Sequence, residues 1–372
     1  MLSVIRSEAA FLVTAVSTAI LYTIGADWLY DLSNPLVFTG LFVWIFSVMV
    51  WSAFAAVRHA DSLAEILGEP YGTLILTISV ISIEVSVISA VMLTGGADPT
   101  LARDTMMAVM MLVLNGMVGV SLLIGGLRHR EQAFNLDGAR AFLSVLITLA
   151  TISLVLPRFT ISTSDASLTT TQSILFSLVT VALYATFLAI QTTRHRGFFV
   201  EPGEVEASHP PEHGKHPHGL ETRSISYHAV MLLLTLVPIV LLSKKLAVVL
   251  DAAIDILNAP LALSGVLVAL LILAPEGLAA FRAASMNHLQ RAVNISLGSA
   301  VATISLTVPA VVAIALMTDT YVILGLDGAE TVILLLTLVL SLVTFGSART
   351  NVLLGAVHLV VLAVYIILIF DP

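Results

Sequence analysis

The stretch that decides the fold is NAPLALSGVLVALLILAPEGLAAFRAA, from Asn258 to Ala284. It is apolar and long enough to cross the hydrocarbon core of a bilayer as a helix. It nevertheless carries one carboxylate, Glu276, between Pro275 and Gly277. A charged acid at that depth costs about 2.5–3.5 kcal/mol on insertion scales, and Pro275 removes a backbone donor beside it. Glu276 is therefore expected to serve a function.

A second stretch repeats this pattern far upstream. Residues 71–94 read YGTLILTISVISIEVSVISAVMLT, with Glu84 near the centre. We interpret Glu84 and Glu276 as the only two acids deep within apolar runs. The hypothesis is that they form one site, built from two halves of a transporter.

The composition is that of a polytopic membrane protein. Of 372 residues, 58% are apolar and 11% are charged, whereas soluble domains contain about 25% charged residues. There is no cysteine, which excludes disulfides and thiolate sites, and we find no phosphate-binding loop of the Walker kind. We therefore expect a transporter driven by an ion gradient. It would not be an enzyme and would need no cofactor; its partners would be the lipid bilayer and the transported cations, with no nucleic acid.

Apolar runs near 20 residues and the polar breaks between them predict eleven transmembrane helices. The fold class is thus all-α integral membrane protein. The expected helices are 8–25, 36–57, 71–94, 104–127, 139–157, 171–191, 226–243, 258–284, 290–317, 329–346 and 351–370. The N-terminal run is interpreted as a retained helix and not as a signal peptide.

One long loop divides the chain. Residues 192–225 are rich in Glu, His, Pro and Gly, a composition that favours a solvated linker over a weak metal site. The predicted organisation is a first helix (1–35), a five-helix repeat (36–191), an acidic and His-rich cytoplasmic loop (192–225) and a second, inverted five-helix repeat (226–372). Opposed repeats with an acid in each are the pattern of many secondary transporters.

The basic residues predict the orientation. With the N-terminus inside, inner segments hold 12 of the 16 Lys and Arg residues and outer segments hold 4. Positive residues favour the cytoplasmic side. We therefore expect a multi-pass inner-membrane protein with a cytoplasmic N-terminus and an external C-terminus. The oligomeric state is left open.

The paired acids suggest a specific chemistry. Two carboxylates neutralise a dication, and hard cations prefer oxygen ligands. Without the cation, desolvation and mutual repulsion favour the protonated acids. Glu84 and Glu276 could then hold either a metal ion or protons, which is the minimum requirement for cation/proton exchange. The alternative is that each acid is only a structural hydrogen-bond partner between helices.

Candidate neutral ligands lie near each acid. The segment NISLGSAVATISLTVP, residues 294–309, offers a small polar face whose hydroxyls and carbonyls could coordinate a cation or only pack. The hydroxyls near Glu84 could join the site or bond back to their own helix. The face comprises Gly298, Ser299, Thr303, Ser305 and Thr307. The candidates for neutral ligands or site lining are Ser82, Ser86, Asn115, Pro275, Gly298, Ser299 and Thr303. His358, alone in the last apolar run, is interpreted as a packing residue.

Three of these motifs carry a family resemblance: Ile83-Glu84-Val85, Pro275-Glu276-Gly277 and Gly298-Ser299. Together with the segments around them, over most of the chain, they make the sequence resemble the bacterial calcium/proton antiporters. These form the cation/proton-exchanger branch of the Ca²⁺:cation antiporter superfamily. The resemblance implies eleven helices, five-plus-five inverted repeats after a first helix, and a cation site at the bilayer midplane.

The resemblance also implies that Glu84 and Glu276 are the essential cation- and proton-binding residues. Departures leave the neutral ligands open. Many exchangers read Gly-Asn-x-x-Glu where this chain has Val80-Ile81 and Ile272-Leu273, and Gln where it has Ala302. The expected function is exchange of cytoplasmic Ca²⁺ for external H⁺. The alternative is Na⁺ or K⁺ exchange by the same mechanism, with a passive cation channel less favoured.

Overall fold

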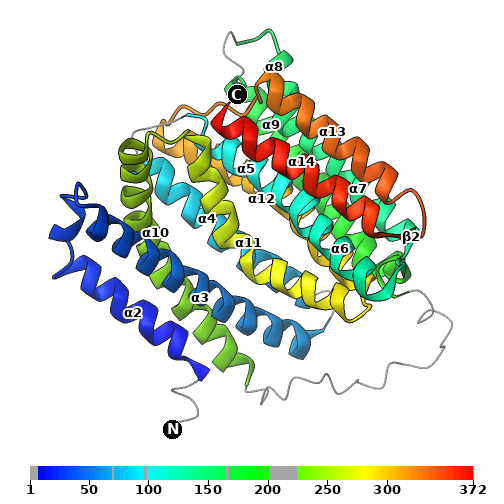
Figure 1. Cartoon of the computed structure of the whole chain (residues 1–372), viewed down its shortest axis with the longest axis horizontal. Helices are drawn as coiled ribbons and strands as arrows, with labels where there is room; N and C mark the ends of the chain where they lie inside the picture. The colour runs from blue at the N-terminus through cyan, green and yellow to red at the C-terminus, as the bar shows by residue number, and fades with distance from the viewer. Residues whose placement is uncertain (1–6, 69–70, 95–98, 164–166, 202–223, 372) are drawn as a thin grey trace.

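Long apolar runs become helices here because a backbone away from water must satisfy its own hydrogen bonds. The computed structural model describes residues 7–68, 71–94, 99–163, 167–201 and 224–371. Within them the chain forms a bundle of helices (Figure 1). The first half comprises α2 (Ala9–Tyr22), η1 (Asp27–Leu29), α3 (Pro35–Leu67), α4 (Tyr71–Thr94), α5 (Leu101–Met111), η2 (Leu112–Met117), α6 (Val118–His129), β1 (Gln132–Ala133), α7 (Leu136–Ala150), η3 (Thr151–Val155), α8 (Leu156–Phe159), α9 (Thr170–Ala189), η4 (Ile190–Arg194) and η5 (Arg196–Phe199). The second half comprises α10 (Ile225–Leu257), α11 (Ala262–Ser285), α12 (Leu289–Thr318), α13 (Gly328–Thr344), β2 (Arg349–Thr350) and α14 (Val352–Phe370).

Several of these segments run on without a break into single membrane-length helices. α5, η2 and α6 form one span, α7, η3 and α8 another, and α9 and η4 a third. In the described residues, eight helices are long and apolar enough to cross a membrane, and three shorter apolar helices accompany them. The prediction of an all-α membrane protein with eleven helices is confirmed.

Two predicted helix ends are wrong. The run ended at residue 57 continues as α3 to Leu67, and the run ended at 243 continues as α10 to Leu257. In both cases charged residues, such as Lys244 and Lys245 of α10, were assigned to a loop. A helix is held by backbone bonds from residue i to i−4, so charged side chains do not end it where one of its faces reaches water or a partner.

Helix α12 occupies the centre of the arrangement. It packs against α4 and α11, the two helices that carry the predicted acids, and also against α7 and α9. The two longest helices, α3 and α10, pack against each other, and both contact α4. Figure 1 shows α3 and α10 crossing on the side of the bundle away from α13 and α14. The acids are therefore held between a long helix pair and α12.

Helix α2 is fastened to this long pair by a polar cluster at its start. Glu8 accepts hydrogen bonds from Arg58 Nη2 at 2.9 Å and from the Tyr227 hydroxyl at 2.6 Å. His59 Nε2 lies 3.0 Å from the same carboxylate, and its Nδ1 lies 3.1 Å from Nδ1 of His228. Glu8 is buried. Its charge is thus balanced within the bundle, and the cluster joins α2 to α3 and α10.

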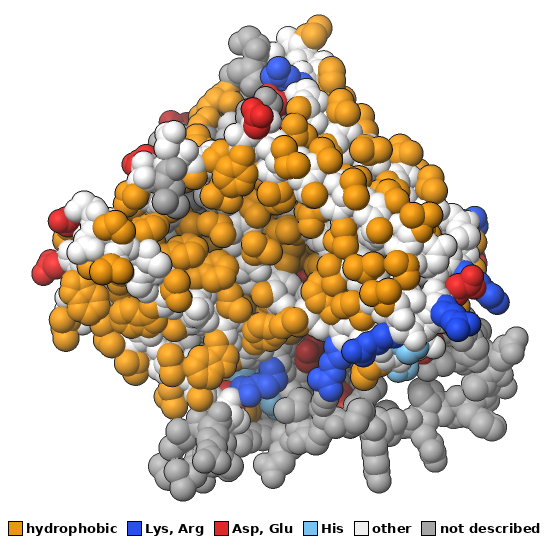
Figure 2. Space-filling model, in the orientation of Figure 1, with side chains coloured by type: hydrophobic (Ala, Val, Ile, Leu, Met, Phe, Trp, Pro, Cys, Tyr) orange, Lys and Arg blue, Asp and Glu red, His pale blue; other side chains and the backbone are white. Residues whose placement is uncertain are grey.

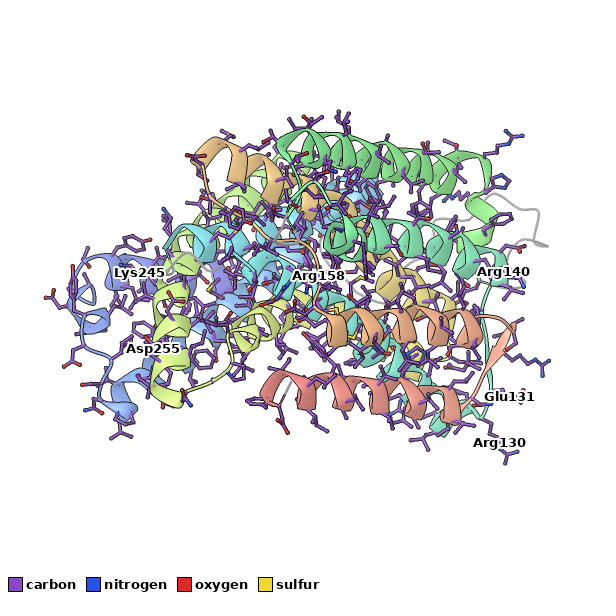
Figure 3. The ribbon with its side chains drawn as sticks, turned by 90° about the horizontal axis from the view of Figure 1, so that it is seen from above. Arg130, Glu131, Arg140, Arg158, Lys245 and Asp255 are labelled. Carbon is purple, nitrogen blue, oxygen red and sulfur yellow. The ribbon has the colours of Figure 1, made fainter. Side chains whose placement is uncertain are left out.

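The outer surface matches a chain surrounded by lipid. Figure 2 shows a broad apolar face, with charged side chains gathered near its margins. In the view from above, Arg130, Glu131 and Arg140 lie at one end of the molecule, and Lys245 and Asp255 lie toward the other (Figure 3). An apolar belt between charged ends is the surface expected of a helical membrane protein.

Helices α6 and α14 approach closely because two glycines face each other. A Cβ added at Gly355 would come within 2.7 Å of the Gly119 carbonyl oxygen and of the Leu123 amide nitrogen. Small residues at such crossings let membrane helices pack backbone against backbone. This contact fixes α14 on the central span that contains η2.

Gly355→Val should therefore destabilise the bundle. The added side chain meets backbone, which cannot rotate away, and overpacking of this kind costs about 1–3 kcal/mol. The measurement is the thermal unfolding midpoint of the purified protein in detergent. Gly40→Val in α3 is the matched control, because nothing lies within 4 Å of a Cβ at Gly40. Equal midpoints for the two variants would contradict the close α6–α14 contact.

Candidate cation site

The two predicted acids come from different helices, and both accept hydrogen bonds from side chains of α12. Glu84 of α4 is 0% exposed, and its Oε2 accepts a hydrogen bond from the Thr303 hydroxyl at 2.9 Å. Glu276 of α11 is partly exposed, and its Oε2 accepts one from the Ser299 hydroxyl at 2.5 Å. Ser299 and Thr303 lie four residues apart on α12, which is about one helical turn. Both carboxyl groups therefore reach the same side of α12.

Four buried hydroxyls share the face of α12 that reaches the acids. Ser296, Ser299, Thr303 and Thr307 fall within an arc of about 80° at 3.6 residues per turn. We call these four residues the hydroxyl stripe. None of them bonds back to the helix in the described structure, whereas Ser305, on the opposite side, donates to the Val301 carbonyl at 2.5 Å. The prediction that Ser305 belongs to the same polar face as Ser299 and Thr303 is thus wrong.

One carboxylate oxygen of the site has no partner. Oε1 of Glu84 is buried and accepts no hydrogen bond from any described residue. The hydroxyl of Thr307 is likewise buried without a well-formed hydrogen bond, and it interacts with the same carboxyl group. Buried polar atoms are almost always paired, so each exception needs an explanation such as a bound ion or water. Here the two exceptions are neighbours, one anionic and one neutral.

Two of the candidates near Glu84 have their hydroxyls engaged elsewhere. Ser82 donates to the Ile78 carbonyl at 2.6 Å, and Ser86 donates to the Ser82 carbonyl at 2.5 Å. Both hydroxyls therefore bond to the backbone of their own helix, which is the more common role for hydroxyls inside helices. They are not brought to the carboxylates.

The hydrogen bonds of Asn115 in the described structure go to groups other than the two glutamates. It lies in the π-helical η2, is fully buried, and donates through Nδ2 to the Thr337 hydroxyl at 2.8 Å. Its Oδ1 lies 3.0 Å from Nδ1 of His358, whose Nε2 lies 2.9 Å from the Thr344 hydroxyl. This network joins the central span to α13 and α14. His358 is accordingly a buried, hydrogen-bonded packing residue.

The remaining candidates, Pro275 and Gly298, flank the site and have no side-chain group that bonds to the carboxylates. Pro275 is buried within α11, which continues through it as one helix. The proline still leaves the carbonyl of Leu271 without its usual helical donor. A Cβ added at Gly298 would lie 3.7 Å from the ring of Phe142. Gly298 therefore contributes to packing against α7.

One acid near the site was missed by the sequence analysis. Asp61 of α3 lies close enough to Glu276 for their charges to interact. It falls in the part of α3 that was assigned to a loop, which hid its position. In the described residues, no three acidic or histidine side chains gather as a ready metal cage. The site is thus two carboxylates with hydroxyls, supported by a third acid nearby.

Besides Glu84 and Glu8, the described structure buries a further acid near the start of a span. Asp104 of α5 is also buried, and it accepts from Arg103 Nε at 2.8 Å. Arg103 Nη1 also donates to the Gly325 carbonyl at 3.3 Å and lies 3.6 Å from Asp327. Because a cation already balances Asp104, it differs in kind from Glu84, which is bonded only to a neutral hydroxyl.

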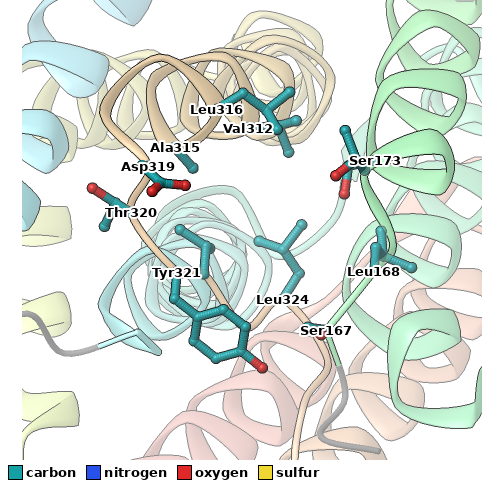
Figure 4. Close-up of a pocket in the computed structure, with 12 residues that line it drawn as sticks. Ser167, Leu168, Ser173, Val312, Ala315, Leu316, Asp319, Thr320, Tyr321 and Leu324 are labelled. Carbon is teal, nitrogen blue, oxygen red and sulfur yellow. The ribbon is translucent and has the colours of Figure 1, made fainter. Parts of the chain in front are cut away.

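A separate cavity lies away from these acids. It has a volume of about 260 Å³ and sits where α12 ends, opposite the start of α9 (Figure 4). Asp319, Tyr321 and Ser173 are among the side chains that line it. Its α12 residues, such as Val312 and Ala315, belong to the side of the helix away from the hydroxyl stripe. The cavity is therefore separate from the carboxylate pair.

The chain as a whole is similar to several known transporters. The family description "Sodium/calcium exchanger protein" matches residues 37–193. The sodium-potassium/proton antiporter ChaA of Escherichia coli (strain K12) is 46% identical over 320 residues, covering 86% of each chain. The structure of native YfkE is similar with a TM-score of 0.73 and 20% identity, covering 98% of this chain and 100% of that one. The H⁺/Ca²⁺ exchanger CAX follows with a TM-score of 0.62 and 15% identity, covering 97% and 88%.

Proposed function

We propose a function from one premise: this chain belongs to the sodium/calcium exchanger protein family, within the Ca²⁺:cation antiporter superfamily. Members of this family are membrane transporters and not enzymes. We infer that the chain carries a cation out of the cytoplasm in exchange for protons. Glu84 and Glu276 would hold the cation in one half of the cycle and protons in the other.

The observation that carries this proposal is the pairing of each acid with a hydroxyl on α12. A hydroxyl can donate to a carboxylate, as Thr303 does to Glu84 and Ser299 does to Glu276. The same oxygen can turn its lone pairs toward a metal ion. Each acid–hydroxyl pair can therefore coordinate a cation or adjust to a proton without moving a helix. Protons and cation compete for the same oxygens, and that competition couples their transport.

We favour Na⁺ or K⁺ as the principal cargo. The relative that is 46% identical is named a sodium-potassium/proton antiporter. The site also offers few oxygens: Val80, Ile81, Ile272, Leu273 and Ala302 put apolar side chains where many exchangers have amide ligands or their neighbours. Ca²⁺ takes six to eight oxygen ligands, a demand that a set of two carboxylates and a few hydroxyls meets poorly.

Ca²⁺, the first choice of the sequence analysis, remains the second candidate. Two carboxylates supply the two negative charges that neutralise a dication. A second structure of YfkE, with 19% identity to this chain, names that protein a Ca²⁺/H⁺ antiporter, but similarity at that level supports a common fold and not a common cargo. The two candidates share one mechanism and differ only in which ion the oxygens select.

The inverted-repeat organisation and the orientation are part of the proposal. α3 and α10 each have 33 residues, and α4 and α11 each have 24. Asp61 and Asp251 each lie 26 residues after the first residue of their helix, and Glu65 and Asp255 follow four residues later. These matches support two related halves. With the basic residues favouring a cytoplasmic N-terminus, Glu84 and Glu276 would approach the site from opposite sides of the membrane.

Everted membrane vesicles provide the direct test. A proton gradient is established, and its dissipation is measured after separate additions of Na⁺, K⁺ and Ca²⁺ with the membrane potential clamped. We expect Na⁺ or K⁺ to dissipate the gradient at the lowest concentration, and the half-saturating concentration to rise as the pH falls, because protons compete for the carboxylates. Ca²⁺ acting at the lowest concentration would reverse the order of the cargoes. Cation flux without coupled proton movement would exclude an antiporter and favour a channel.

A further inference from the structure

We propose that Thr307 is a further ligand of the transported cation, acting with Oε1 of Glu84. This inference rests on the proposed cation/proton exchange and adds a residue to its site. It extends the site along α12 by one turn beyond Thr303, on the side away from Ser299 and Glu276. The ligand bound there would be a hard cation, for which neutral and anionic oxygens are the preferred donors.

The first support is the position of the Thr307 hydroxyl. Thr307 is 0% exposed and its hydroxyl interacts with the Glu84 carboxyl group, yet its Oγ1 makes no well-formed hydrogen bond to any described residue. A threonine inside a helix can donate to the carbonyl four residues earlier, as Thr105 and Thr235 do in this protein. Thr307 forgoes that bond in a buried setting, where an unpaired hydroxyl is costly.

The second support is the unpaired oxygen of Glu84. Thr303 already donates to Oε2, which leaves the fully buried Oε1 with no described partner. The carboxylate thus has one oxygen held by the protein and one available to a ligand. The Thr307 hydroxyl faces this same carboxyl group, and neither Thr307 Oγ1 nor Glu84 Oε1 makes a well-formed hydrogen bond in the described structure. Together they supply one anionic and one neutral donor.

The third support is the order of contacts along the hydroxyl stripe. Ser299 serves Glu276, Thr303 serves Glu84, and Thr307 follows at the same four-residue spacing. Each step is about 6 Å along the helix axis. A cation at Glu84 therefore has Thr303 on one side and Thr307 on the other. Hydroxyls therefore lie on both sides of Glu84 along α12. The ligands of the cation are then not limited to the groups between the two acids.

Thr307→Val tests this role with little change in shape, because a methyl group replaces the hydroxyl. We expect the half-saturating cation concentration in vesicles to rise about tenfold, the size of effect that loss of one polar contact of about 1.4 kcal/mol produces. The maximal rate should change by less than about twofold, since both carboxylates remain. Thr307→Ser, which keeps the oxygen, should restore the wild-type concentration dependence.

Ser305→Ala is the matched control. Ser305 is buried on the same helix, but its hydroxyl lies on the opposite side and bonds to its own backbone. We expect this variant to keep the wild-type half-saturating concentration. Cation binding to purified protein in detergent, measured by calorimetry with NaCl, KCl or CaCl₂, provides a second readout that does not depend on transport.

The outcomes separate this inference from the proposed function. Wild-type cation affinity in Thr307→Val would overturn the role of Thr307 as a ligand and would leave it as a structural neighbour of the Glu84 carboxyl group. An equal loss in Ser305→Ala would show that the effect is general to α12 packing, and would also overturn it. If Thr307→Val inserts poorly, Thr307→Ala is judged by the same affinity measurement. Exchange that survives Glu84→Gln would instead refute the carboxylate mechanism itself.

Discussion

Glu84→Gln and Glu276→Gln should each abolish cation/proton exchange while leaving membrane insertion intact. The amide keeps the shape of the side chain and can still bond to Thr303 or Ser299, but it carries no charge and binds no exchangeable proton. Removing an acid from a membrane segment also favours insertion. The measurement is dissipation of the proton gradient in vesicles, with the amount of inserted protein matched across variants. Rates should fall to background.

The conservative variants refine this expectation. Glu84→Asp and Glu276→Asp keep the charge but withdraw the oxygens by one methylene, so we expect a reduced and not an absent rate. Wild-type, pH-dependent exchange in either Gln variant would refute the two-carboxylate mechanism. Activity in Glu276→Gln alone would indicate that Glu84 is sufficient. That result would favour a monovalent cargo, because one carboxylate balances a single charge.

Arg103→Met should cause the largest loss of stability among single charge removals in the described residues. Arg103 is 9% exposed and balances Asp104, which is 5% exposed, while its Nη1 reaches the Gly325 carbonyl. Removing one partner of a buried ion pair leaves an uncompensated charge and costs about 3–5 kcal/mol. We expect a marked fall in the thermal unfolding midpoint of the purified protein, and Arg103→Met/Asp104→Asn should recover part of it.

Arg349→Met is the matched control for that prediction. Arg349 pairs with Glu131 at 3.2 Å, but the two side chains are 76% and 58% exposed. Exposed pairs of this kind contribute about 0–1 kcal/mol, so the midpoint should hardly move. A similar shift in both variants would mean that burial of Arg103 and Asp104 does not strengthen their pairing. No recovery in the double variant would point to the Gly325 contact as the main role of Arg103.

The parts of the fold predicted from sequence are those controlled by hydropathy. Apolar length alone located the eleven helices, because a bilayer leaves the backbone few alternatives. Glu84 and Glu276 were found because acids in apolar runs are rare, and Ser299 and Thr303 because hydroxyls recur near Glu276 along one helix. The ends of α3 and α10 were missed, since hydropathy cannot distinguish a charged loop from a charged helix end.

The direction of individual side chains could not be predicted in the same way. Asn115 was a reasonable oxygen ligand by type, but the π-helical turn of η2 directs it to Thr337 and His358. Ser305 has the same chemistry as Ser299, yet six residues of helical rotation place it on the other side of α12. Asp61 becomes visible only once α3 is known to continue past Arg58. Such details depend on helix rotation and packing, which composition does not encode.

The length of α3 and α10 has a consequence for the surrounding bilayer. Each helix of 33 residues measures about 50 Å at 1.5 Å per residue, whereas the hydrocarbon core is about 30 Å thick. A helix with such a mismatch tilts or extends its ends among the lipid headgroups. Because α3 and α10 pack against each other and against α4, a thinner or thicker membrane would change the tilt of both. Lipid thickness is thus mechanically linked to the helix that carries Glu84.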